Sequence, residues 1–270
     1  MRNVAFGQYY PTGSFIHRLD PRTKLLAGLV FIAAAFVADS YWAYLACYAF
    51  LIFAILVSKI PIFQVLKTIK SIFFIVLLSV VLNVFFHHEG KVLWSWWKIT
   101  ITEGGLLYSG QIILRLMFLV LSTSLITLTS TPTELTDGLE KFMTPLKYLR
   151  FPVHDVAIIM SIALRFIPTL MEETDKITMA QKARGAKFDT GGPFARAKAL
   201  LPVLIPLFVS AFRRADELAL ALDARCYNAT DARTKMKILR FGWKDVTALL
   251  FLALFLTVIV FFRLGFFGLL

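Results

Sequence analysis

Two copies of one short motif are the part of this chain whose residue types could do chemistry. Each copy is an arginine between two small residues, and the copies are Ala183-Arg184-Gly185 and Ala224-Arg225-Cys226. A guanidinium presents five N–H donors in a planar fork, and small neighbours leave that fork unshielded. Such a group can form charge-assisted hydrogen bonds in an acidic or carbonyl-lined groove of a partner. The motifs therefore predict docking rather than catalysis.

Each motif closes a segment with the apolar periodicity of an amphipathic helix. The apolar positions are Ala163, Phe166, Ile167, Leu170, Met171 and Ile177 before the first motif, and Leu207, Phe208, Ala211, Phe212, Leu218 and Leu222 before the second. Asp175 precedes Arg184 by the same interval that separates Asp216 from Arg225, which hints at an internal duplication. We expect two helices that end at the motifs.

Residues for catalysis are missing from the sequence. Gly90-Lys91 is followed by Val92 and lacks the upstream glycine of a P-loop, and there is no nucleophile elbow or His-Glu-x-x-His pattern. Glu172-Glu173 is an adjacent pair of carboxylates, and on an amphipathic helix a solvated face explains it best. We expect a protein that is not an enzyme and holds no cofactor.

The sequence also lacks the residues that a metal site or a set of disulfide bonds would need. The adjacent His87 and His88 cannot both face one metal from one helix face, and Glu89 is the only carboxylate near them. Cys47 lies in an apolar run and Cys226 in a charged region, so two cysteines supply no disulfide framework. The sequence therefore predicts no metal site.

Composition places the chain among helical membrane proteins. Hydrophobic residues make up 58% and the mean hydropathy is +0.72, which predicts an all-α, polytopic membrane fold. The net charge of +12 reflects the positive-inside rule better than nucleic-acid binding, because the basic residues gather in alternate loops. The expected spans are a tight hairpin of Leu25–Ala38 and Tyr41–Val57, then Ser71–Phe86, Leu106–Thr129 and Asp245–Phe262.

Charge also orients the spans. The N-terminus lacks the pattern of a cleaved signal peptide, and 25 of the 29 basic residues fall on one side, which we expect to be cytoplasmic. Residues 130–244 carry 18 of them, and prolines at 145, 152, 168, 193, 202 and 206 disfavour unbroken transmembrane helices there. Trp94, Trp96 and Trp97 are expected as an aromatic belt on an outer loop.

Three further polar residues are candidates for subunit contacts. Asp20 is an expected N-cap before Pro21, with Arg22 and Lys24 at the level of the lipid headgroups. Arg115 lies within an apolar span, where a bare charge costs at least about 3 kcal/mol, so it should face protein. Binding to helix carbonyls and a pivot against a partner subunit are both open for Arg115.

At the two motifs, and at the segment from Ser14-Phe15-Ile16-His17-Arg18 to Lys24, the chain resembles the transmembrane scaffold, or T component, of energy-coupling factor transporters and the related cobalt permease subunits. The resemblance covers the whole length. It implies a non-catalytic coupling subunit of an importer for vitamins or metals in the cell membrane. Its implied partners are two cassette ATPases and a separate substrate-binding membrane subunit, the S component.

The resemblance also assigns roles to residues and segments. The coupling residues it implies are Ala183, Arg184, Gly185, Ala224, Arg225 and Cys226, with Cys226 where glycine is common in the family. The implied organisation is an N-terminal segment with four spans over 1–129, a cytoplasmic coupling module over 130–244 and a final span over 245–270. The alternative is a self-contained secondary transporter or channel, for which Arg115 is the only candidate site residue.

Overall fold

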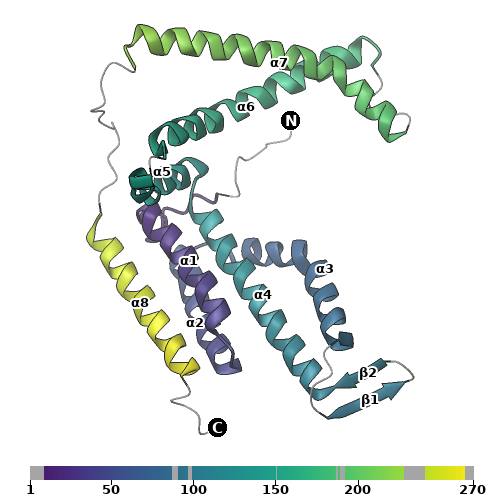
Figure 1. Cartoon of the computed structure of the whole chain (residues 1–270), viewed down its shortest axis with the longest axis vertical. Helices are drawn as coiled ribbons and strands as arrows, with labels where there is room; N and C mark the ends of the chain where they lie inside the picture. Colours follow the sequence, from purple (N-terminus) through teal and green to yellow (C-terminus); the bar gives the residue numbers. More distant parts are fainter. Residues whose placement is uncertain are drawn as a thin grey trace. The chain divides into compact units, whose positions relative to one another are not determined.

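The computed structural model describes residues 9–86, 91–96, 99–149, 151–186, 188, 192–227 and 241–264 (Figure 1). The chain divides into two compact units, each with its own internal contacts. The first unit is Met1–Val153 with Leu239–Leu270, and the second unit is His154–Ile238.

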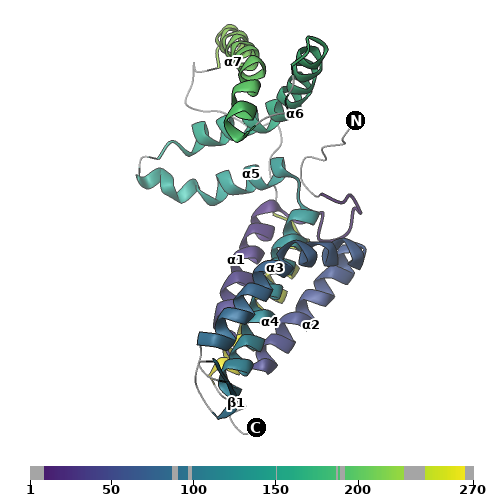
Figure 2. The same ribbon diagram turned by 90° about the vertical axis from the view of Figure 1, so that its right-hand side faces the viewer.

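The first unit contains most of the secondary structure, and Figure 2 shows α1, α2, α3 and α4 running side by side. Its elements are α1 (Pro21–Val37), α2 (Tyr41–Ser58), α3 (Ile62–Phe86), β1 (Val92–Trp96), β2 (Ile99–Thr102), α4 (Glu103–Thr129), α5 (Pro132–Phe142), the 3-10 helix η1 (Thr144–Leu149) and α8 (Trp243–Arg263). The second unit is built from two long helices, α6 (Val153–Ala183) and α7 (Pro193–Ala224).

Local sequence signals explain how the first helices begin. The Asp20 carboxylate accepts a hydrogen bond of 2.9 Å from the Arg22 amide, and Pro21 is the first residue of α1, as predicted. Ser40 caps α2 in the same way, so Asp39 and Ser40 form the turn of the predicted helical hairpin. This part of the prediction is confirmed.

Aromatic rings fill the core of the first unit between α1, α2, α4 and α8. Phe31 makes edge-to-face contacts with Phe118 and Phe255, with ring centroids 6.0 Å and 5.9 Å away. Phe50 stacks on Phe255 at 4.4 Å. Small buried residues, Ala34, Ala35, Ala38, Ala43 and Cys47, let the first two helices approach other backbones closely. The core therefore combines ring packing with close helix contacts.

Five of the described helices are long and apolar enough to cross a membrane: α2, α4, α6, α7 and α8. The two halves of α3, bent by 52°, could form a sixth span. The 17 residues of α1 make it shorter than these. The all-α, polytopic membrane fold is confirmed, and α4 and α8 match the predicted last two spans closely.

The structure corrects the expectation that prolines interrupt the second half of the chain. Pro168 lies inside α6, and Pro202 and Pro206 lie inside α7. Each proline removes one backbone N–H donor, and the remaining hydrogen bonds keep helices of 31 and 32 residues continuous. Pro145 lies in η1 and Pro193 is the first residue of α7, where a proline fits without loss of a hydrogen bond.

Two other segments differ from the sequence-based expectation. Residues 62–70, which precede the expected span Ser71–Phe86, are already helical in α3. Trp94 and Trp96 lie in β1, which pairs with β2 in an antiparallel hairpin that the sequence pattern did not predict. His87, His88, Glu89 and Trp97 lie outside the described residues.

Candidate docking site

The first motif forms the end of α6. Ala183 is the last helical residue, and Gly185 follows with a φ of +89°, in the left-handed region where glycine has no steric penalty. The Gly185 amide donates to the Lys182 carbonyl at 2.9 Å, and the Ala186 amide donates to the Gln181 carbonyl at 3.0 Å. This pair of bonds is a Schellman motif, which satisfies the last carbonyls of the helix.

The second motif ends α7 with the same geometry. Cys226 has a φ of +52°, its amide donates to the Asp223 carbonyl at 2.9 Å, and the Tyr227 amide donates to the Leu222 carbonyl at 3.0 Å. The acceptors lie at the same offsets as in the first motif. Cysteine in place of glycine therefore preserves the turn, although a left-handed backbone costs an L-residue about 1–2 kcal/mol.

All six motif residues are exposed, so both arginines stand at uncovered helix ends. The small residues on either side leave the guanidinium groups accessible to a protein surface. In this respect the structure matches the sequence-based picture of two arginine-tipped helices.

Side-chain contacts place the two motifs at opposite ends of the α6 and α7 pair. The Gln181 amide nitrogen lies 3.4 Å from the Pro202 carbonyl, Glu173 pairs with Arg214 at 3.2 Å, and the Arg214 guanidinium lies 5.8 Å from the Phe166 ring centroid. Residues with higher numbers in α6 contact residues with lower numbers in α7, so the two helices run antiparallel.

The antiparallel pairing separates the motifs widely. From the level of Pro202, near the end of α6, α7 continues for 22 residues to Ala224. At 1.5 Å per residue this amounts to roughly 30 Å along the helix. One groove of a partner cannot hold both arginines.

The structure corrects the interpretation of Glu172-Glu173 as a solvated pair, because Glu173 contacts α7. Glu172 is exposed, but the Glu173 side chain is only 24% exposed and bonds to both Ser210 and Arg214 on α7. A signal for this contact was present in the sequence. Glu173 precedes Arg184 by eleven residues, and Arg214 precedes Arg225 by the same interval.

Comparison with known proteins identifies the family of the chain. The family model described as CbiQ, "Cobalt transport protein", matches residues 12–238. The chain belongs to this CbiQ/EcfT family. It is 45% identical over 267 residues to the "Energy-coupling factor transporter transmembrane protein EcfT" of Ruminiclostridium cellulolyticum, covering 99% of this chain and 100% of the relative.

Other relatives with the same name are equally similar. The proteins of Brevibacillus brevis and Bacillus subtilis are 48% and 43% identical over 245 and 263 residues. They cover 91% and 97% of this chain, and 92% and 99% of their own lengths are matched. The predicted family is confirmed, and the comparisons favour a transporter subunit over the self-contained secondary transporter or channel.

In this EcfT-family chain Arg115 binds within its own fold. Its guanidinium donates to the Tyr44 hydroxyl at 3.0 Å and to the Ala38 carbonyl at 3.4 Å, and it lies 3.6 Å from the Asp39 carboxylate. Arg263 of α8 reaches the same carboxylate at 3.8 Å. Arg115 therefore joins α4 to the turn between α1 and α2, and its side chain stays 27% exposed.

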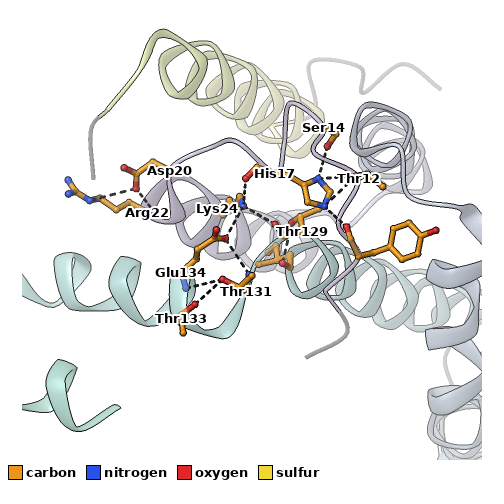
Figure 3. A network of polar contacts seen from close by, with 12 residues as sticks. Thr12, Ser14, His17, Asp20, Arg22, Lys24, Thr129, Thr131, Thr133 and Glu134 are labelled. Atoms are coloured by element: carbon orange, nitrogen blue, oxygen red, sulfur yellow. Dashed lines mark hydrogen bonds and ion pairs between the residues drawn. The ribbon is translucent and has the colours of Figure 1, made fainter. Parts of the chain in front are cut away.

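Asp20 and Arg22 belong to a polar network at the other end of the first unit (Figure 3). The Asp20 side chain is 2% exposed, and Arg22 lies 3.7 Å from it with 34% of its side chain exposed. The Asp20 amide donates to the buried Asp245 carboxylate at 2.7 Å, which ties α1 to α8. Asp245 also accepts hydrogen bonds from Thr23 and Gly242.

Lys24 is the centre of the same network in Figure 3. Its ammonium donates to the carbonyls of Thr129 at 2.8 Å and His17 at 3.1 Å, and it lies 3.9 Å from the Glu134 carboxylate. The expectation that Lys24 lies at the level of the lipid headgroups is wrong, because its side chain is buried against acceptors from the N-terminal segment, α4 and α5. Lys24 therefore joins the N-terminal segment, α4 and α5 to the start of α1.

Both ring nitrogens of His17 lie within hydrogen-bonding distance of other groups in this network. Its Nε2 lies 2.8 Å from the Tyr10 carbonyl, so this nitrogen carries the proton, and Nδ1 can accept from the Ser14 hydroxyl at 2.7 Å. Desolvation by burial lowers the pKa of His17, and the hydrogen bond to the Tyr10 carbonyl opposes this shift.

No metal cluster accompanies the docking motifs within the described part of the chain. No group of three or more His, Cys, Asp or Glu side chains there could hold a metal ion. The first unit has an apolar cavity of about 120 Å³ between α1, α2, α4 and α8, with Phe31, Phe50 and Phe251 among its lining residues.

Proposed function

We propose that this chain is the transmembrane coupling subunit of an energy-coupling factor importer, in which Arg184 and Arg225 dock into two cassette ATPases. The observation that supports the proposal most strongly is the pair of matched helix ends, each with an exposed arginine before a left-handed residue. The separation of roughly 30 Å between the motifs requires two docking grooves, as a pair of ATPases would supply.

The ATPases provide the chemical energy in this proposal. The sequence has no P-loop, so in this proposal the ATPases bind the phosphates of ATP and this chain has a non-catalytic role. Closure of the ATPases on ATP displaces the docked ends of α6 and α7. That displacement reorients a substrate-binding S component that carries a vitamin or a metal ion.

The apolar surface of the second unit supplies the contact area for the membrane side. Phe194, Phe208, Phe212 and Leu220 of α7 are each more than 60% exposed. We assign these faces to the S component and the inner membrane surface, with residues 130–244 on the cytoplasmic side of the cell membrane. The basic residues place the N-terminus on that side as well.

The three polar candidates outside the motifs contribute in different ways. The side chains of Arg115 and Arg22 are partly exposed, so a neighbouring subunit can contact them. The Asp20 side chain is buried, so it supports an interface only by fixing the start of α1.

Uptake by reconstituted vesicles tests the proposal, alongside pull-down of the ATPases. Removing one member of a buried, hydrogen-bonded charge pair costs about 2–5 kcal/mol. We expect Arg184→Ala or Arg225→Ala to reduce ATP-driven uptake at least tenfold, and the double variant to abolish it and loosen ATPase attachment. Lysine should rescue only partly, because it lacks the planar fork.

The matched control is Arg213→Ala, which removes an exposed arginine from the middle of α7, away from both motifs. This variant should transport normally. Near-normal uptake by the Arg184→Ala, Arg225→Ala double variant would show that the motifs are ordinary helix ends.

A further inference from the structure

Glu173 and Arg214 occupy equivalent positions in the two halves of the second unit, and they contact each other. Each residue precedes its motif arginine by eleven positions, and their side chains pair at 3.2 Å. Two antiparallel segments whose equivalent residues meet are related by an approximate twofold axis through that contact. This relationship places one polar cluster at the centre of the helix pair.

Glu173 uses both carboxylate oxygens in this cluster. Oε1 accepts from the Ser210 hydroxyl, and Oε2 accepts from the Arg214 guanidinium. The guanidinium also lies over the Phe166 ring at 5.8 Å. Partial burial shields the pair, since 24% of Glu173 and 31% of Arg214 are exposed. Charge-assisted bonds with this geometry fix the crossing of the helices more firmly than free surface charges.

Little apolar burial accompanies the cluster. Among the described residues of α7, Val203 alone is buried, and between Ile158 and Ala183 of α6 no described side chain is buried. The polar contacts therefore carry an unusually large share of what joins α6 to α7 within this chain. Loss of the cluster should loosen the pair without unfolding either helix.

The cluster also lies midway between the two docking ends. Eleven residues of helix correspond to about 16 Å, so each motif arginine lies at a similar distance from the Glu173 and Arg214 contact, in opposite directions. A load applied at one end reaches the other through this contact. The position is that of a joint between the two docking helices.

We propose that Glu173, Ser210 and Arg214 are positioning residues that hold α6 and α7 at a fixed crossing, and that coupling of ATP hydrolysis to transport requires this crossing. The inference rests on the proposed function of the two motifs. It assigns no contact between these three residues and ATP, substrate or the ATPases. Their effect is transmitted through the position of Arg184 and Arg225.

The test compares Glu173→Gln and Arg214→Ala with the charge-swapped pair Glu173→Arg, Arg214→Glu in the full transporter complex. We expect each single variant to keep both ATPases bound, to lower uptake at least fivefold, and to raise the ATP hydrolysed per substrate imported. The swapped pair should recover at least half of the lost uptake. Glu172→Gln and Arg213→Ala, the exposed neighbours, are the matched controls and should resemble the parent.

A distance measurement separates loosening from loss of folding. Spin labels on the native Cys226 and on Ala186→Cys report the separation of the two helix ends, with Cys47 replaced by alanine. The distribution should be narrow in the parent and broad in Glu173→Gln, at unchanged helix content. Uptake and distance distributions equal to the parent in both single variants would overturn the proposal.

The docking role of the arginines and the role of the Glu173 and Arg214 contact can be tested separately. If the Arg184→Ala, Arg225→Ala variant transports normally, the docking function itself is wrong. If that variant is inactive while Glu173→Gln and Arg214→Ala behave like the parent, only the proposed role of the Glu173 and Arg214 contact is wrong.

Discussion

Gly185 and Cys226 occupy the same position in two helix ends and share a left-handed backbone, with φ angles of +89° and +52°. The matching hydrogen bonds from residues 186 and 227 show that the turn is common to both motifs. Because the turn directs the chain away immediately after each arginine, its geometry determines how the guanidinium is presented. Strain at this position should therefore affect docking.

The first prediction concerns that strain. Gly185→Ala should weaken the α6 end by about 1 kcal/mol, because alanine is disfavoured at this φ, and amide exchange at residue 186 should accelerate roughly fivefold. Crowding does not contribute, since no atom lies within 4 Å of the added Cβ. Gly192→Ala is the control, because its surroundings are equally open and its φ is −69°. Equal exchange in both variants would contradict the prediction.

The second prediction uses the cysteines already present. Cys226 is exposed and Cys47 is fully buried, so an impermeant maleimide should modify Cys226 alone. Labelling should occur in inside-out vesicles and not in intact cells, and bound ATPases should reduce its rate at least tenfold. Arg184→Ala should leave this protection intact, whereas Arg225→Ala should diminish it. Labelling of Cys226 from the outside of intact cells would reverse the proposed topology.

The third prediction follows from His17. Its lowered pKa means that the folded state prefers the neutral imidazole, while the unfolded chain protonates near pH 6.5. The stabilisation is therefore complete above about pH 6.5 and is lost as the pH falls from there through the folded-state pKa. We expect the thermal midpoint in detergent to decline as the pH falls below about 6.5, and His17→Gln to flatten that decline. Parallel profiles for the two proteins would exclude His17 as the titrating group.

The fourth prediction concerns the buried Asp245. Its carboxylate accepts from the Asp20 amide, the Thr23 hydroxyl and the Gly242 amide, at 2.7, 3.2 and 2.9 Å. Asp245→Ala leaves these donors without their acceptor and should lower the free energy of unfolding by about 3 kcal/mol. Asp245→Asn should lower the free energy of unfolding by a smaller amount, because the amide retains one oxygen as an acceptor. Asp216→Ala removes an exposed carboxylate as the control, and an equal thermal midpoint for both alanine variants would show that Asp245 is not a structural tie.

Sequence periodicity and capping rules predicted the parts of the fold that depend on nearby residues. The ends of α6 and α7 at Ala183 and Ala224, and the α1 cap at Asp20, all follow from local patterns. The continuity of helices through Pro168 and Pro202 did not follow, because helix breaking depends on the hydrogen bonds of whole turns on either side.

Contacts between distant segments were the main features that local patterns missed. Glu173 looked solvated because Arg214, its partner, is 41 residues away, and only the antiparallel pairing brings the two together. Lys24 was expected at the lipid headgroups for the same reason, since Thr129 and Glu134, which contact its buried ammonium, come from later helices. The motif arginines themselves were found because small neighbours and a helix end are visible within a few residues.

The contact between Glu173 and Arg214 lies eleven residues from each motif arginine, and these equal lengths of helix have a mechanical consequence. Forces of equal size that draw the two motif ends toward each other exert balanced moments about the contact, so the helix pair undergoes no net rotation and the work changes the angle between the helices. A force on one end alone is unbalanced and turns the pair as a rigid body. Concerted closure of two ATPases and the action of a single ATPase would thus deliver different movements to the membrane.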